Sequence, residues 1–218
     1  MPKRIVVIKH SVIGVCLMLT MLSCGPRPPV DINRRPMAVS AKEYPRQFKD
    51  WSRDIRVIPF NGLENVLTAR VTYLSYTFRE AYIAAVAADL NASPADQDKI
   101  RTDKMAGVDT GHQFFVTLMS AVKNFDDLDP KEGPWTIRLR NDQGKETTPS
   151  SVEEIEHPTA AHEKYFAFQS TYRKAYRITF PFAAADGSPI IGDSAHAFEI
   201  TFASPYGRGT AKWEIEGR

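Results

Sequence analysis

Apolar and polar residues alternate along four stretches in the C-terminal half of the chain. A two-residue repeat with one apolar face is typical of a strand that buries one side. Turn-forming residues such as Asp186-Gly187 separate the stretches. The pattern therefore predicts antiparallel strands whose apolar faces pack together. The alternation covers residues 135–140, 176–182, 198–202 and 213–216.

Helical spacing replaces this alternation in a segment of about residues 76–107. Thr77 and Glu80 have the spacing of a capping box, in which each side chain bonds the other residue's amide. Ser93 offers an N-cap through its hydroxyl, Pro94 suits the first helical turn, and this second helix should end near Gly107. We expect two helices inserted between strands.

The segments on either side of these helices are also predicted to be strands. Val66–Leu74 is rich in Val and Thr, although a single long helix from Glu64 is an open alternative. Phe114–Met119 is an apolar run of strand length. Together the elements predict a mainly β (α+β) fold, an antiparallel immunoglobulin-like β-sandwich with a two-helix insertion at about 76–107, covering residues 46–218.

The chain begins with the pattern of a secretory signal. Lys3, Arg4 and Lys9 precede an apolar stretch, residues 11–22, which a small residue and Cys24 follow. Twelve residues are fewer than the roughly 20 needed to cross a bilayer as a helix. Export therefore explains this segment better than a transmembrane anchor, which is the alternative.

Met21-Leu22-Ser23-Cys24 resembles the lipobox of bacterial lipoproteins. The resemblance implies a signal peptide over residues 1–23, cleavage after Ser23 and lipidation of Cys24. Gly25 resembles the default for sorting to the outer membrane, with the domain facing the periplasm. An incidental cysteine after an ordinary signal is the alternative. The region 69–119 also loosely resembles uncharacterised small lipoproteins of Gram-negative bacteria.

A segment rich in proline and arginine follows Cys24. Four prolines between Gly25 and Pro36 favour extended backbone, so we expect a tether over residues 24–45 that lifts the domain off the membrane. The excess of basic residues between Gly25 and Phe60 could meet anionic lipid headgroups, or could simply keep a tail in solution.

Charge and cysteine content exclude several functions. Cleavage removes Lys3, Arg4 and Lys9 from 28 basic residues, which leaves 25 against 26 acidic ones. This near balance of charge lacks the excess of basic residues that is typical of proteins that bind nucleic acid. Cys16 leaves with the signal and Cys24 is consumed by lipid, so thiol catalysis, iron–sulfur clusters and cysteine zinc sites are excluded, and no cofactor is predicted.

Metal and catalytic motifs are weak. His157 and His162, with Glu163, could ligate a metal, but Pro158 disfavours a helix through the pair and a solvated loop is preferred. The acidic cluster around Asp129 is better explained as a turn in which Asp side chains cap nearby amides than as a calcium loop. No nucleophile elbow is present. We predict neither a metal site nor a catalytic site.

Aromatic residues are concentrated between Tyr165 and Phe182. Most should fill the core. The alternative is that an exposed pair forms a partner-binding patch, and Tyr165, Phe166 and Tyr172 are the candidates for it.

The sequence thus predicts a membrane-anchored envelope lipoprotein with a non-catalytic binding or structural role. The alternatives are an accessory or assembly factor that binds an envelope protein, an envelope hydrolase, and capture of a small ligand between the helices and the sheets.

Overall fold

The computed structural model describes residues 27–32, 39–59, 65–166 and 173–217. The fold is mixed α+β and mostly β, with two antiparallel sheets of five and four strands. The predicted signal peptide over residues 1–23, Cys24 and Tyr172 lie outside the described residues.

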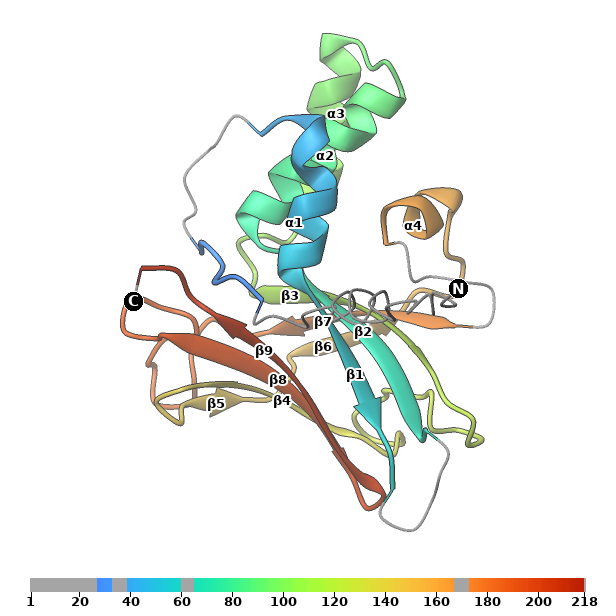
Figure 1. Cartoon of the computed structure of the whole chain (residues 1–218), viewed down its shortest axis with the longest axis vertical. Helices are drawn as coiled ribbons and strands as arrows, with labels where there is room; N and C mark the ends of the chain where they lie inside the picture. Colours follow the sequence, from blue (N-terminus) through green and yellow to red (C-terminus); the bar gives the residue numbers. More distant parts are fainter. Residues whose placement is uncertain (1–26, 33–38, 60–64, 167–172, 218) are drawn as a thin grey trace, which may run out of the picture.

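The paired helices α2 and α3 are inserted in the chain between β2 and β3, which are neighbouring strands of one sheet (Figure 1). In chain order the elements are η1 (Ala41–Glu43), α1 (Tyr44–Trp51), β1 (Ser52–Val57), β2 (Leu67–Tyr73), α2 (Tyr76–Asp89), α3 (Pro94–Met105), β3 (His112–Met119), β4 (Thr136–Asn141), β5 (Glu146–Thr147), β6 (Ser151–Glu154), α4 (Ala160–Tyr165), β7 (Lys174–Phe180), β8 (Ala197–Ser204) and β9 (Gly207–Glu214).

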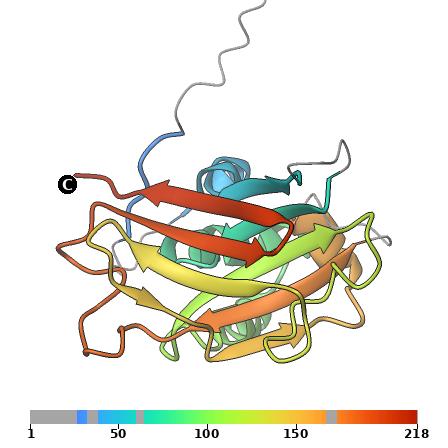
Figure 2. The ribbon, with the colours of Figure 1, turned by 90° about the horizontal axis from the view of Figure 1, so that it is seen from below.

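The two sheets pack face to face and enclose the main core (Figure 2). Their strand orders are β1-β2-β3-β7-β6 and β5-β4-β8-β9. Aromatic rings join the layers: Tyr73 contacts Phe198 with ring centroids 5.3 Å apart, and Phe114 contacts Trp213 at 5.8 Å. All four side chains are buried, so the apolar faces that the alternation predicted do meet in the interior.

The helices lie on the other face of the five-stranded sheet, away from the second sheet (Figure 1). A second apolar layer fills the space beneath them. It consists of aromatic residues from α1, α2, β3 and the end of α4: Tyr44, Phe48, Phe78, Tyr82, Phe115, Tyr165 and Phe166. Because both faces of the sheet are covered, β3 is buried at nearly every position.

The two inserted helices form where the sequence predicts them, with one difference in capping. Ser93 caps α3 as expected, its hydroxyl accepting from the Asp96 amide. At α2 the cap is Ser75, whose hydroxyl accepts from the Phe78 amide, and Thr77 lies inside the helix. The capping box proposed for Thr77 is therefore wrong, because an equally good hydroxyl lies two residues earlier.

The strand predicted at Val66–Leu74 is confirmed as β2, and the alternative of one long helix from Glu64 is wrong. Within the described residues, none of the helices is long and apolar enough to cross a membrane. The sequence patterns missed short elements: η1, α1, β1, β5, β6 and α4.

The first described residues pack on the domain instead of extending away from it. Val30 is 2% exposed and pairs with Ile215 beyond β9 in a parallel bridge. The Val30 amide donates to the Glu214 carbonyl at 2.7 Å, and the Glu216 amide donates to the Val30 carbonyl at 2.9 Å. The described residues 27–32 of the expected tether over residues 24–45 therefore pack on the domain, and the first helix or strand within the described residues begins at Ala41.

Candidate functional site

A polar cleft opens between the inserted helices, α4 and the outer face of the five-stranded sheet. Its volume is about 140 Å³. The alternative of small-ligand capture predicted a site at this place, between the helices and the sheets. The described lining residues are Leu74, Arg79, Tyr82, Asp103, Lys104, Ala106, Gln113, Phe115, His162, Phe166 and Arg177.

Arg79 of α2 forms the buried wall of the cleft and is only 5% exposed. Its Nε donates to the Leu74 carbonyl at 3.0 Å, and its Nη1 donates to the carbonyls of Lys104 and, at 3.5 Å, Ala106. Its Nη2 donates to Gln113 Oε1 at 2.6 Å. One guanidinium thus ties α2 to β2, to the end of α3 and to β3.

The hydrogen-bond acceptors of Arg79 are all neutral, although the group itself is charged. Burial and, to a smaller extent, the nearby Arg177 guanidinium together lower the pKa of Arg79 to about 10. Buried charges in proteins are normally paired with an opposite charge. The hydrogen bonds of Arg79 hold it in place without neutralising it.

Arg177 of β7 supplies a second guanidinium. It lies opposite Phe115 in the β3–β7 register and opposite Glu153 in the β6–β7 register. The side chain is exposed, and among the described residues its guanidinium makes no hydrogen bond or ion pair. Lys104 adds a third cation, with its ammonium 2.7 Å from the Asp103 carboxylate.

His162 closes the cleft from α4, its ring stacked on Phe115 at 5.6 Å between centroids. The Thr159 amide donates to His162 Nδ1 at 3.0 Å, so the neutral ring carries its proton on Nε2. Burial lowers the pKa of His162 below its usual 6.5, and Lys104 and Arg177 lower it further. The imidazole therefore presents an N–H donor without a charge at neutral pH.

Two of the three aromatic residues predicted to form an exposed patch are buried. Tyr165 is 6% exposed and Phe166 4% exposed, and Phe166 stacks on Phe115 with centroids 3.9 Å apart. Tyr165 packs edge-on against Tyr44 at 5.6 Å and Tyr82 at 5.0 Å. The expectation of exposure is wrong for this pair, because α1 and α2 cover the residues that α4 presents. Tyr172 lies outside the described residues.

A second, more apolar hollow of about 400 Å³ lies between α1, α2 and α4. Tyr44, Phe48 and Tyr165 contribute its rings, and Asp89 and Lys164 form an ion pair of 2.8 Å among its lining residues. Tyr165 also donates to the Asp89 carboxylate at 2.5 Å. These contacts fix the position of α4, which in turn fixes His162 at the polar cleft.

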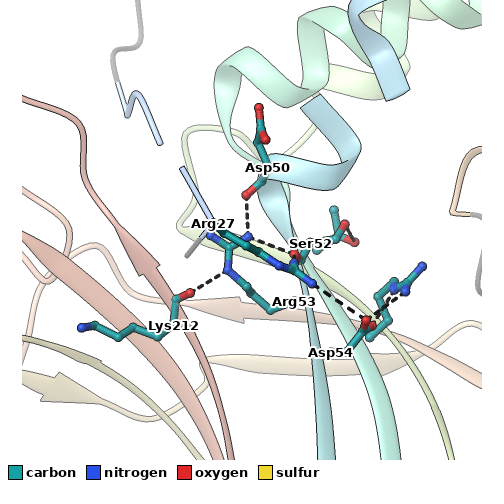
Figure 3. Close-up of polar contacts among 8 residues, drawn as sticks. Arg27, Asp50, Ser52, Arg53, Asp54 and Lys212 are labelled. Carbon is teal, nitrogen blue, oxygen red and sulfur yellow. Dashed lines mark hydrogen bonds and ion pairs between the residues drawn. The ribbon is translucent and has the colours of Figure 1, made fainter. Parts of the chain in front are cut away.

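The junction of the N-terminal segment with the sheets is a polar network on the far side of the domain (Figure 3). Arg27 donates to the Ser52 carbonyl and lies 3.9 Å from the Asp54 carboxylate. Arg53 donates to the Lys212 carbonyl at 2.7 Å, which links β1 to β9. Burial lowers the pKa of Arg53 to about 10, with Arg27 adding to the effect. The network attaches the start of the described chain to both sheets.

The other candidates have structural roles. The Asp129 carboxylate accepts from the amides of Lys131 at 2.7 Å and Glu132 at 3.0 Å, which confirms the predicted capped turn. His157 lies in the bend before α4, and His162 forms the capping box of that helix with Thr159. In the part of the chain that the structure describes, no three His, Cys, Asp or Glu side chains are grouped to hold a metal ion.

Comparison with known proteins gives little beyond this geometry. No family model matches the chain, and no curated protein matches it. A crystal structure of a novel protein of unknown function from Burkholderia pseudomallei is similar with a TM-score of 0.35 and 12% identity, covering 81% of this chain and 90% of that one.

Sequence reasoning missed the two arginines of the cleft. Arg79 had one local signal, since it is a charged residue at the start of a helix whose other faces are largely apolar. Arg177 had no signal, because a polar residue at its place in the alternation reads as an ordinary solvent-facing position.

Proposed function

We propose that this chain is a lipid-anchored envelope lipoprotein of the outer membrane, facing the periplasm, with a non-catalytic binding role. The observation that carries the binding role is the cleft lined by Arg79, Lys104, His162 and Arg177. These side chains donate hydrogen bonds, and Arg79, Lys104 and Arg177 carry positive charge; the described lining includes no serine, threonine or cysteine nucleophile. The anchor rests on the lipobox-like ending at Cys24.

The packing of the N-terminal segment limits how far the domain can stand from the bilayer. Arg27 follows Cys24 by three residues, which span at most about 11 Å. Val30 is bonded to Glu214, so the segment cannot extend while that bridge is intact. With lipid on Cys24, the edge of the domain beside Arg27 and Arg53 would lie close to the headgroups.

Metabolic labelling with a palmitate analogue tests the anchor. The unaltered chain should become labelled, and Cys24→Ser should abolish the label. Cys16→Ser is the matched control, because Cys16 leaves with the signal peptide and its loss should not affect labelling. Labelling of Cys24→Ser at the level of the unaltered chain would refute a lipid on this cysteine.

A second candidate is an accessory factor of an envelope assembly. α3 has no buried residues and stands away from the sheets, a form suited to contact with another protein (Figure 1). Crosslinking from a photoreactive residue at position 97 or 98 of α3, in detergent-solubilised membranes, tests this role. A single reproducible crosslinked protein would support it, and crosslinks to none would oppose it.

We also propose that the two sheets form an immunoglobulin-like β-sandwich. Two antiparallel sheets that pack face to face support it. An experimental structure whose strand connections follow no Greek-key path would refute it.

A further inference from the structure

Positive charge in the cleft exceeds negative charge. Among the described lining residues Arg79, Lys104 and Arg177 are cations, and Asp103 supplies the one carboxylate. The Asp103 side chain is 70% exposed and already forms an ion pair with Lys104. Solvent and this ion pair screen its negative charge, so it does not neutralise the other cations of the cleft. The two guanidiniums and the ammonium therefore repel one another across the cleft.

We propose that this cleft binds a small oxyanion, a phosphate or carboxylate group, through the Arg177 guanidinium, the Lys104 ammonium and the Nε2–H of His162. The inference rests on the proposed function, because it names the ligand class of the same cleft. Arg79 is a positioning residue, since its hydrogen bonds are used within the protein.

The donors suit an oxyanion in number and type. Within the described ranges the Arg177 guanidinium makes no hydrogen bond or ion pair, and a guanidinium offers two parallel N–H groups to a carboxylate or phosphate. His162 has Nδ1 occupied by the Thr159 amide, which leaves Nε2–H as its available donor. Lys104 has three ammonium hydrogens and one carboxylate partner.

The size and walls of the cleft restrict the ligand to a small group. A drug-sized pocket has about 300–1,000 Å³, whereas this one has about 140 Å³. Phe115 and Phe166, both buried and stacked on each other, form its apolar wall. Such a wall lowers the local dielectric and strengthens the attraction between the cations and an anion.

Glu153 is an internal competitor for Arg177, because it lies opposite Arg177 in the strand register. It accepts from the Ser151 hydroxyl at 2.7 Å and does not line the cleft. If Glu153 weakens the field at Arg177, its neutralisation should strengthen anion binding.

Titration of the native protein in detergent with inorganic phosphate, and separately with acetate, tests the proposal. Ionic strength is held constant with sodium chloride, and calorimetry is paired with the NMR signals of His162. We expect saturable binding with a Kd on the order of 1 mM for at least one anion. Arg177→Gln should raise that Kd by about tenfold or more. Arg208→Gln, an exposed arginine of β9, should leave it unchanged, and Glu153→Gln should lower it or leave it unchanged.

Acetamide, the neutral counterpart of acetate, separates failure of this inference from failure of the proposed function. Acetamide binding without anion binding would overturn the oxyanion class and keep the cleft as a binding site. No saturable binding of either anion, or equal binding by the Arg177→Gln variant, would also overturn the proposal, whereas labelling of Cys24 would stand independently.

The source of the oxyanion is decided by flotation of the Cys24→Ser chain with phosphatidylglycerol vesicles. Flotation that Arg177→Gln abolishes would support a lipid headgroup as the ligand. Phosphate or acetate binding without flotation would support a free anion.

Discussion

Replacement of Phe166 by alanine tests whether α4 is docked on the domain or presents an exposed aromatic patch. The ring is 4% exposed and contacts Phe115 at 3.9 Å, Tyr82 at 5.6 Å and Phe78 at 6.0 Å between centroids. Removal of a buried phenyl ring costs about 3–5 kcal/mol in unfolding free energy through lost burial and the cavity left behind. An exposed ring would cost about 0.5 kcal/mol or less.

Urea denaturation of the Cys24→Ser chain, followed by tryptophan fluorescence, measures this difference. With a slope of about 2 kcal/mol per molar urea, the midpoint should fall by roughly 1.5–2.5 M. Leu90→Ala is the control, because Leu90 is 66% exposed and its loss should barely move the midpoint. If Phe166→Ala behaved like Leu90→Ala, the docked position of α4 and the closed wall of the cleft would both be wrong.

Three further predictions concern the charged groups near the cleft. Arg79→Lys should destabilise the protein by about 2–4 kcal/mol in urea denaturation, because one ammonium cannot bond α2, α3 and β3 together and leaves buried carbonyls unpaired; stability equal to the unaltered chain would contradict this. Arg101→Ala should accelerate hydrogen exchange throughout α3 while β8 stays protected, since Arg101 bonds the buried Glu80 carboxylate at 2.6 and 2.8 Å and α3 buries no side chain of its own; unchanged exchange would show that other contacts hold α3. The third concerns pH. The pKa of His162 is lower in the folded protein than the usual 6.5, so the unfolded chain binds a proton more readily, and stability should fall as pH decreases from about 6.5 through the folded value. His162→Gln should reduce this slope in denaturation midpoints measured between pH 7 and 5, and an unchanged slope would exclude His162 as its source.

Local sequence patterns predicted β7, β8, β9 and the start of α3 correctly. The alternation around Ile178, Phe198 and Trp213 identified β7, β8 and β9, because a strand buried on one side must repeat every two residues. Ser93 followed by Pro94 located the start of α3 for a similar reason, since capping depends on neighbouring residues alone.

Short elements were not predictable in this way. α1 has eight residues within a charged and proline-containing segment, and α4 has six residues that begin two positions after Pro158. Neither is long enough to display a clear period, so their helices depend on packing and not on propensity: α1 packs on α2, and α4 packs on Phe115 of β3.

The sequence by itself determined the longer strands β2, β3, β4, β7, β8 and β9 and the inserted position of α2 and α3. It also predicts a lipid anchor at Cys24. Only the tertiary structure decided that Tyr165 and Phe166 are buried, because residues as distant in sequence as Tyr44 cover them. It also decided that Arg79 and Arg177 face one cleft. Burial and electrostatic proximity are properties of non-local contacts, and no local pattern of polar and apolar residues encodes them.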